Sequence, residues 1–438
     1  MRFVTTKNLH LTPAVSFSFA LFEGIAPDGG LYVPESMPKW SPEELARLPS
    51  MTLAAIGARV LQPFVDELDS DALLAVLEEA LAFPIPLVEV EPGIYALELF
   101  HGPTLAFKDV GARVMARLMA ALFRGDNPLT ILVATSGDTG SAVAHAFHDV
   151  PHTRVAILYP KGRVSPTQEA QLTMFNGEAT NVRAYAAGGS FDDCQRLTKA
   201  AFADPVLSRR ANLTSANSIN IGRLLPQMIY YAHAVGQLTA KSTGVAQDFS
   251  PAVFSTPSGN FGNITAGLMA KRSGIDIRQF VAATNVNDVV PEYLVTGTFT
   301  PRPSIHTLAN AMDVGNPSNF DRLMWLYGSD LDAIRRDVVG SRHDDVEVRA
   351  TIQQVYEERG YLLDPHSAIA YLGLTGQKGR EGQGVFLATA HPAKFAEVVE
   401  PIIGRAIPKP QPLVEALATK RKILEIDATL GAVEKVLA

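Results

Sequence analysis

Only one cysteine, Cys194, occurs among the 438 residues, so the chain holds no intramolecular disulfide and fits a reducing compartment. No apolar run reaches the roughly 18 residues that a membrane-spanning helix requires. Residues 1–7 also lack the apolar core of a signal peptide. Basic charge is not in excess, because the net charge is −7 and no basic patch stands out. We therefore expect a cytoplasmic protein with no membrane partner and no nucleic-acid partner.

The composition is that of a folded protein, because 47% of the residues are apolar and 19% are charged. The length allows two or three domains. Residues 1–95 show a mixed pattern of short strands, turns and two helices, and the second helix is predicted to begin with Ser70 as its N-cap. From residue 129 to 215, apolar segments alternate with helical ones, which is typical of βαβ units and a parallel sheet.

The predicted elements define an α/β fold. Strands are predicted at 129–134, 154–159, 181–186, 252–256, 278–284 and 384–389, and helices at 166–175, 191–202 and 219–237 and between the first strand and residue 148. Residues 376–384 are expected to form an exposed loop. We predict two doubly wound sheets flanking a ligand cleft, with an additional N-terminal α+β region. The predicted domains are 1–95, a large α/β domain of 96–128 and 216–438, and a small α/β domain of 129–215.

Lys108 has an unusual context, because apolar residues precede it at the start of a predicted helix. Burial of an ammonium group is costly and lowers its pKa. A deprotonated lysine amine can form a Schiff base with a carbonyl. Taken alone, a lysine of this kind is most often a surface residue whose stem lies on the core.

Residues 258–263 form a glycine-containing turn between a predicted strand and a predicted helix. Backbone N–H groups at a helix N-terminus bind anions, and glycine lets the chain approach them closely. A plain strand-to-helix connection explains the turn as well. A Schiff-base lysine and a phosphate cradle together indicate pyridoxal phosphate.

Residues 135–141 form a second such turn, in which hydroxyl and N–H groups suit a carboxylate or a phosphate. Helix capping by Ser136, Asp138 or Thr139 is the alternative, and both roles are compatible. Lys161 follows a predicted strand, at the edge where a parallel sheet presents ligand-binding residues.

Residues 215–223 precede the long predicted helix. Asn217 and Ser218 are predicted to cap that helix, with Arg223 directed towards the cleft. An arginine near amide and hydroxyl donors suits a phosphate dianion. Taken alone, Arg223 or Lys161 fits a solvated surface charge better than a ligand-binding residue.

Three histidines say less about the function of the chain. His145 and His148 lie three apart on one predicted helix, but no third ligand has suitable spacing, so we predict no metal site. His391 is consistent either with a place in the cleft or with a structural role.

Several motifs together make the chain resemble the threonine synthases of the longer microbial type, in the tryptophan-synthase-β-like group (fold type II) of pyridoxal-phosphate enzymes. The motifs lie at residues 19–34, 101–109, 134–140, 217–223, 258–263 and 388–395. The resemblance implies conversion of O-phospho-L-homoserine and water to L-threonine and phosphate, by γ-elimination and β-addition of water. It is compatible with a monomer or a homodimer.

The resemblance also implies roles for single residues. Lys108 is similar to the catalytic Schiff-base lysine, and Thr389 to the hydroxyl residue that faces the pyridine nitrogen. The residues that correspond to the cofactor-phosphate cradle are Gly259, Asn260, Phe261, Gly262 and Asn263. The residues that correspond to the substrate site are Ser136 and Thr139 for the carboxylate, and Lys161, Asn217, Ser218, Arg223 and Asn260 for the phosphate.

Asp138 departs from many relatives across this fold type, which have asparagine near the ring oxygen of the cofactor. An ionised aspartate cannot donate a hydrogen bond to that oxygen, so the sequence leaves open whether Asp138 contacts the cofactor. Two alternative functions also stay open. One is another enzyme of the same fold type, such as a serine/threonine dehydratase or a cysteine synthase, and the other is a non-catalytic protein that binds a phosphate ligand.

Overall fold

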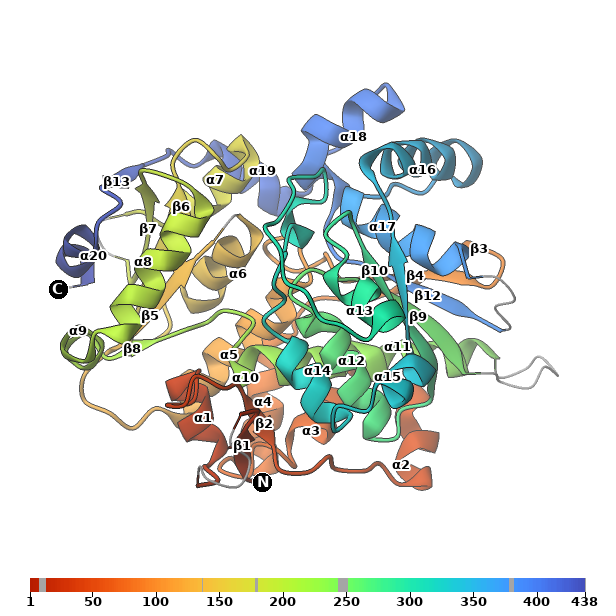
Figure 1. Ribbon diagram of the computed structural model, residues 1–438, viewed down its shortest axis with the longest axis horizontal. Helices are drawn as coiled ribbons and strands as arrows, with labels where there is room; N and C mark the ends of the chain where they lie inside the picture. Colours follow the sequence, from red (N-terminus) through yellow and green to blue (C-terminus); the bar gives the residue numbers. More distant parts are fainter. Residues whose placement is uncertain (8–12, 136, 178–179, 243–250, 378–381, 438) are drawn as a thin grey trace.

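The computed structural model describes residues 1–7, 13–135, 137–177, 180–242, 251–377 and 382–437. In this part of the chain two main sheets form the framework (Figure 1). The larger sheet has six strands, in the order β11 (Val338–Arg342), β10 (Ile277–Thr284), β9 (Ala252–Pro257), β12 (Gly384–Ala388), β4 (Ile94–Glu98) and β3 (Leu87–Glu91). Its neighbouring strands are parallel, except that β3 and β4 pair in antiparallel orientation.

The smaller sheet is parallel throughout. Its five strands follow the order β13 (Leu424–Ile426), β7 (Val182–Ala187), β6 (Thr153–Pro160), β5 (Leu129–Ala134) and β8 (Leu213–Thr214). The helices around it are α6 (Asp138–Phe147), α7 (Pro166–Thr173), α8 (Phe191–Ala203), α9 (Pro205–Arg210) and α20 (Leu430–Leu437). In Figure 1 this sheet lies on the left and the larger sheet on the right.

The remaining elements are mostly helical. The N-terminal region comprises the antiparallel pair β1 (Phe3–Thr5) and β2 (Tyr32–Pro34), α1 (Phe17–Glu23), α2 (Pro42–Arg47), the 3₁₀ helix η1 (Leu48–Ser50), α3 (Leu53–Leu61) and α4 (Ser70–Ala80). The elements that follow it outside the smaller sheet are α5 (Lys108–Leu122), α10 (Ile221–Leu224), η2 (Leu225–Gln227), α11 (Met228–Ser242), α12 (Gly262–Arg272), α13 (Val289–Thr296), η3 (Asn310–Met312), α14 (Phe320–Leu326), α15 (Leu331–Asp337), α16 (Asp345–Arg359), α17 (Pro365–Thr375), η4 (Pro392–Phe395), α18 (Ala396–Ile403) and α19 (Gln411–Ala418).

The prediction of an α/β fold with two main sheets and an N-terminal region is confirmed. The predicted domain boundaries differ from the sheets at two points. β3, predicted within 1–95, belongs to the larger sheet, and β13, predicted within 216–438, belongs to the smaller sheet. Both are short edge strands, and local sequence pattern does not reveal which sheet such a strand joins. We propose a boundary before β3 and assign the last residues of the chain to the small domain.

The prediction of one continuous helix over residues 219–237 is wrong. The chain forms α10, then η2 and then α11, and Pro226 lies in η2 where its missing N–H favours a break. Neither Asn217 nor Ser218 caps α10, because Asn220 accepts the N–H of Gly222 at 2.9 Å.

Two other helix starts differ from the sequence-based prediction. Asp69, and not Ser70, caps α4 by accepting the N–H of Ala72 at 2.8 Å. At α6, Thr135 Oγ1 accepts the N–H groups of Gly137 and Gly140, while Asp138 and Thr139 lie within the first turn. Ser136 and residues 378–381 of the predicted loop lie outside the described residues.

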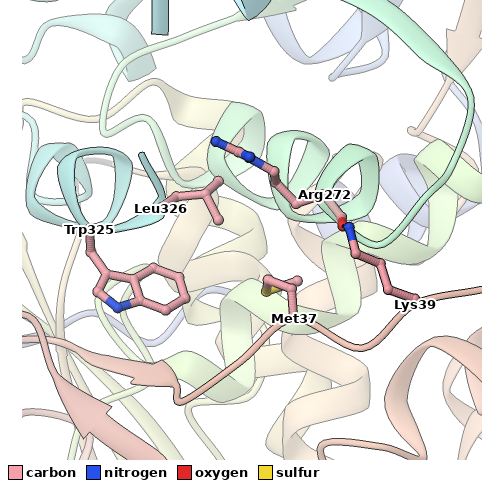
Figure 2. A pocket seen from close by; sticks show the side chains of 5 residues that line it. All are labelled: Met37, Lys39, Arg272, Trp325 and Leu326. Atoms are coloured by element: carbon pink, nitrogen blue, oxygen red, sulfur yellow. The ribbon is translucent and has the colours of Figure 1, made fainter. Parts of the chain in front are cut away.

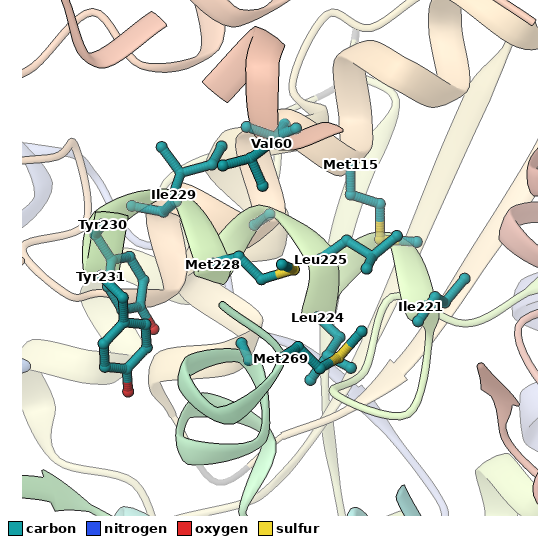
Figure 3. Packing of buried hydrophobic residues seen from close by; sticks show 14 of the residues in the cluster. Val60, Met115, Ile221, Leu224, Leu225, Met228, Ile229, Tyr230, Tyr231 and Met269 are labelled. Atoms are coloured by element: carbon teal, nitrogen blue, oxygen red, sulfur yellow. The ribbon is translucent and has the colours of Figure 1, made fainter. Parts of the chain in front are cut away.

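The run from α10 to α11 passes through the main hydrophobic core, as Figure 3 shows. Side chains from α3, α5 and α12 surround it, among them Val60, Met115 and Met269. Tyr230 and Tyr231 extend from α11 towards α12, where both hydroxyl groups donate to Asn263 Oδ1. This packing fixes the position of α10 relative to the N-terminus of α12.

Candidate functional site

Residues 99–107 and 388–391, which are far apart in the sequence, are joined by backbone hydrogen bonds next to the N-terminus of α5. The N–H of Leu99 donates to Ala388 O at 2.9 Å, and that of Phe107 donates to Thr389 O at 2.9 Å. The N–H of His391 returns a bond to Leu105 O at 3.0 Å. These bonds place Lys108, the first residue of α5, beside the end of β12 and Thr389.

Lys108 is buried, with 14% of its side chain exposed. Burial lowers the pKa of its ammonium group, the Asp138 carboxylate opposes this change, and Lys394 and Arg223 add to it. Lys108 Nζ lies 3.9 Å from Asp138 Oδ2. The environment of Lys108 therefore favours a neutral, nucleophilic amine more than the environment of a surface lysine does.

Lys394, on η4, is a second lysine of the site, and none of its side chain is exposed. Its Nζ donates to Asp138 Oδ1 at 2.9 Å and to Thr104 O at 2.8 Å. Although burial alone raises the pKa of the Asp138 carboxyl, Lys394 and Lys108 outweigh it and hold that pKa well below its ordinary value. Sequence reasoning missed Lys394, although it lies in the 388–395 motif and is flanked by Ala393 and Phe395.

Arg223 is buried and belongs to the same group of charges. Its Nη1 donates to Ala216 O at 2.5 Å, while its Nε is buried without a partner among the described residues. Burial lowers the pKa of the guanidinium to about 10, with Asp109 opposing the shift. In the described part of the chain no carboxylate forms an ion pair with Arg223, so this side of the site has an excess of positive charge that suits an anion.

The turn before α12 is closely packed. A Cβ atom on Gly259 would lie 2.9 Å from both Ala311 O and Met312 Cα, so only glycine fits there. Phe261 has a φ of 62°, in the left-handed region, and Gly262 begins α12. Asn260 Oδ1 accepts from Ser318 Oγ at 2.9 Å.

Asn263 lies in the first turn of α12. Its Oδ1 accepts the two tyrosine hydroxyl groups of α11, whereas its Nδ2 is buried without a partner among the described residues. Free N–H groups at a helix N-terminus together with this amide form a donor set for an anion.

Arg322 is fully buried and holds the loop at 217–220 through its carbonyl groups. Arg322 donates to Ser218 O at 3.3 Å, to Ile219 O at 2.6 Å and to Tyr32 O at 3.0 Å. Sequence reasoning missed Arg322, because its partners are carbonyl groups of distant segments. Asn217 and Ser218 are half-buried, as is Thr139 at α6.

Lys161 follows β6 as predicted, but 54% of its side chain is exposed and its Nζ lies 2.7 Å from Glu425 Oε2 on β13. No hydrogen bond or ion pair among the described residues connects Lys161 to the buried charges. The site residues thus fall into a buried group around Lys108 and a lysine at the rim that already has a partner.

The other candidates from the sequence have structural surroundings. His148 stacks on Phe175, and His145 meets the same ring edge-on. Burial raises the pKa of the Cys194 thiol to about 11, so it is unreactive near neutral pH. His391 Nδ1 accepts the N–H of Ala393 at 3.1 Å. The described residues contain no group of three or more His, Cys, Asp or Glu residues placed to hold a metal ion.

A surface cavity of about 380 Å³ lies between the N-terminal region, α12 and α14 (Figure 2). It is lined by Met37, Lys39, Arg272, Trp325 and Leu326. Lys39 Nζ donates to Arg272 O at the C-terminal end of α12, as the contact in Figure 2 shows. None of the predicted site residues lines this cavity.

The described residues fit pyridoxal phosphate. A buried lysine offers an amine for its carbonyl, and the N-terminus of α12 offers donors for its phosphate.

None of the helices among the described residues has the length and apolar character that a membrane span requires.

The chain is similar to known proteins over almost its whole length. Residues 81–390 match a family model described as pyridoxal-phosphate dependent enzyme, residues 2–81 match threonine synthase N terminus, and residues 368–437 match threonine synthase, C-terminal. The threonine synthase of Haemophilus influenzae is 47% identical over 409 residues, which cover 92% of each chain. That of Escherichia coli is 42% identical over 424 residues, which cover 97% of this chain and 96% of the relative.

Two solved structures have the same fold over the whole chain. The crystal structure of threonine synthase from Escherichia coli superposes with a TM-score of 0.91 at 41% identity, covering 100% of this chain and 99% of the other. The PLP-bound threonine synthase from Brucella melitensis superposes with a TM-score of 0.92 at 36% identity, covering 100% and 98%.

Proposed function

Because the chain belongs to the threonine synthase family of pyridoxal-phosphate-dependent enzymes, we propose that it converts O-phospho-L-homoserine and water to L-threonine and phosphate. The observation that carries the proposal is the environment of Lys108, which is only 14% exposed, lies 3.9 Å from the Asp138 carboxylate and has its pKa lowered by burial and by the cations Lys394 and Arg223. The matches at both ends of the chain to models specific to threonine synthase favour this reaction over those of other enzymes that share the fold.

The bound cofactor supplies an electron sink that acidifies the substrate C–H bonds next to the amine nitrogen. Lys108 would hold the cofactor through its amine and would move protons at the substrate carbons, for which a low pKa is an advantage. Gly259, Asn260, Phe261, Gly262 and Asn263 are proposed to hold the cofactor phosphate at the N-terminus of α12. Thr389 is proposed to offer its hydroxyl to the pyridine nitrogen, which polarises that nitrogen without enforcing its protonation.

We propose that a second set of residues binds the substrate. Ser136, which lies outside the described residues, and Thr139, in the first turn of α6, are proposed to bind the carboxylate. Asn217, Ser218, Arg223 and Asn260 are proposed to bind the phosphate. When the C–O bond breaks, the phosphate leaves with the bonding electron pair, and the buried guanidinium of Arg223 neutralises its growing charge.

Lys161 is proposed to bind the same phosphate as a second cation. Its ion pair with Glu425 is exposed, and exposed pairs are worth only about 0–1 kcal/mol, so a phosphate dianion can displace the carboxylate.

Phosphate release from O-phosphohomoserine, measured with and without added pyridoxal phosphate, tests the proposed function. Wild-type protein should release phosphate and form threonine in equal amounts, and Lys108→Ala should do neither. Release of phosphate without threonine, or turnover of O-acetylserine or serine in preference to phosphohomoserine, would point to another enzyme of the same fold.

We propose that the partner of the chain is a small-molecule substrate and not nucleic acid, and that the chain is a monomer or a homodimer located in the cytoplasm. A sedimentation measurement with and without substrate checks the oligomeric state.

A further inference from the structure

Lys394 has no role in the proposed reaction, yet none of its side chain is exposed to solvent. A buried ammonium group is costly unless its partners compensate for the loss of water. Here the two partners come from different parts of the fold. Thr104 precedes α5 on the side of the larger sheet, and Asp138 follows β5 of the smaller sheet.

Asp138 lies between the two lysines, with Oδ1 at 2.9 Å from Lys394 and Oδ2 at 3.9 Å from Lys108. These two lysines differ in one respect. The Lys108 nitrogen must lose its proton to bind the cofactor and to move protons, whereas Lys394 is anchored to a backbone carbonyl. A buried carboxylate whose only cationic partner became neutral would tend to take up a proton. Lys394 prevents this, because it remains a cation next to Asp138 in either state of Lys108.

We propose that Lys394 is a positioning residue that keeps Asp138 a paired carboxylate facing Lys108, and so sets the pH at which the Lys108 amine reacts. This inference rests on the proposed role of Lys108 as the cofactor lysine. It also gives Asp138 a function for which the hydrogen-bond donor of an asparagine is not needed: its carboxylate acts on Lys108 through its negative charge, 3.9 Å from Nζ.

The charged and titratable groups that face Lys108 come from several elements. Asp138 and Asp364 favour the ammonium form, whereas Lys394 and Arg223 favour the neutral amine. Asp364 caps α17 and is held there by His366 and Ser367, so it has partners of its own. Removal of Lys394 should therefore leave Lys108 more often protonated, and removal of the Asp138 charge should have the opposite effect.

The experiment measures the reactivity of Lys108 in cofactor-free protein. Acetic anhydride is applied at a series of pH values, and acetylation of Lys108 is quantified by peptide mass mapping. Lys394→Met should raise the pH midpoint of Lys108 acetylation by about one unit, and Asp138→Asn should lower it by a similar amount. The two variants thus predict shifts of opposite sign.

Two further variants separate charge from folding. Lys394→Gln keeps a donor for the Thr104 carbonyl without the charge, so it should give the same shift as Lys394→Met with a smaller loss of melting temperature. The double variant Lys394→Met/Asp138→Asn removes both charges and should recover part of the melting temperature that either single change loses. It remains measurable even if one single variant folds poorly.

Unchanged midpoints in all variants, with only lower melting temperatures, would mean that the pair is merely structural and would overturn the proposal. Shifts of the same sign in Lys394→Met and Asp138→Asn would overturn it as well. Because the labelling needs neither cofactor nor substrate, its result is independent of the proposed function. An enzyme that lacks threonine synthase activity could still show the opposite shifts.

Discussion

At the scale of single residues, the site contains one amine that must react, that of Lys108, and several neighbouring groups whose charge stays constant. Arg223 illustrates the fixed kind: it is buried, it bonds a backbone carbonyl, and its Nε has no partner among the described residues. A guanidinium stays charged at neutral pH even where burial lowers its pKa to about 10. Arg223 therefore offers a constant positive charge for a phosphate dianion.

Arg223→Ala should weaken the capture of phosphohomoserine at least tenfold, since a charge-assisted hydrogen bond is worth about 1.5–3 kcal/mol. The loss in kcat should be larger than the rise in KM, because the charge on the departing phosphate grows in the transition state. Steady-state kinetics measure both constants. Cofactor affinity, from absorbance titration, should barely change.

Lys161→Ala provides the matched comparison, because Lys161 lies at the rim and already pairs with Glu425. If the two cations share one phosphate, Lys161→Ala should raise KM with a smaller effect on kcat than Arg223→Ala. Loss of cofactor in Arg223→Ala, with normal turnover by the remaining holoenzyme, would mean that the two phosphate sites are assigned in reverse.

Thr389→Val tests the hydroxyl at the end of β12. Valine has nearly the same volume, so the variant should fold and bind the cofactor, but it should lose most of its activity because the hydrogen bond to the pyridine nitrogen is gone. The absorbance spectrum and kcat report the two effects separately. Full turnover by Thr389→Val would show that the hydroxyl has no electronic role.

At the scale of elements, the site depends on turns that precede helices. The turn before α12 is closely packed, because a Cβ atom on Gly259 would approach Ala311 O and Met312 Cα at 2.9 Å. Real Cβ contacts do not occur at this distance without a shift of the neighbouring backbone. A change at Gly259 therefore acts on the donors at the start of α12.

Gly259→Ala should weaken cofactor binding at least tenfold by displacing these donors, while most of the fold persists. Gly188→Ala is the control, because a Cβ atom there would meet nothing within 4 Å. Cofactor titration followed by absorbance measures both variants. Equal cofactor affinity in the two variants would argue against a cradle at 259–263.

The sequence predicts the elements of this site better than their connections. Apolar runs marked the strands at 129–134 and 252–256 because burial on both faces leaves a clear local signal. Arg322 left no such signal, since its hydrogen bonds reach carbonyl groups some one hundred or more positions away. Lys394 was also missed, because only the fold shows that Asp138 and the Thr104 carbonyl surround it.

At the scale of the whole molecule, the end of the chain returns to the smaller sheet. β13 pairs with β7, and α20 packs on α8, so that Val433 and Leu437 join the apolar cluster that contains Cys194. This long-range return is not visible in the local pattern of the last residues. It makes the last segment part of the small domain and a cover for the buried thiol.

Deletion of residues 424–438 should therefore lower the melting temperature and expose Cys194. As the chain has a single cysteine, reaction with a chromogenic disulfide reagent reports only on this site. The intact protein should react slowly and the deleted protein at least tenfold faster, since burial raises the pKa of the thiol and blocks access to it. Equally slow reaction of both proteins would show that α20 does not protect this cluster.

We propose that Lys108 is the lysine that carries the cofactor, and the second buried lysine, Lys394, makes a test of this assignment demanding. Holoenzyme is reduced with borohydride and digested, and the pyridoxyl group is located by mass mapping. We expect the label on Lys108 alone, because burial and the charges around it favour its neutral amine, whereas Lys394 is held by Asp138 and the Thr104 carbonyl. Recovery of the pyridoxyl group on Lys394, or on any lysine other than Lys108, would contradict it.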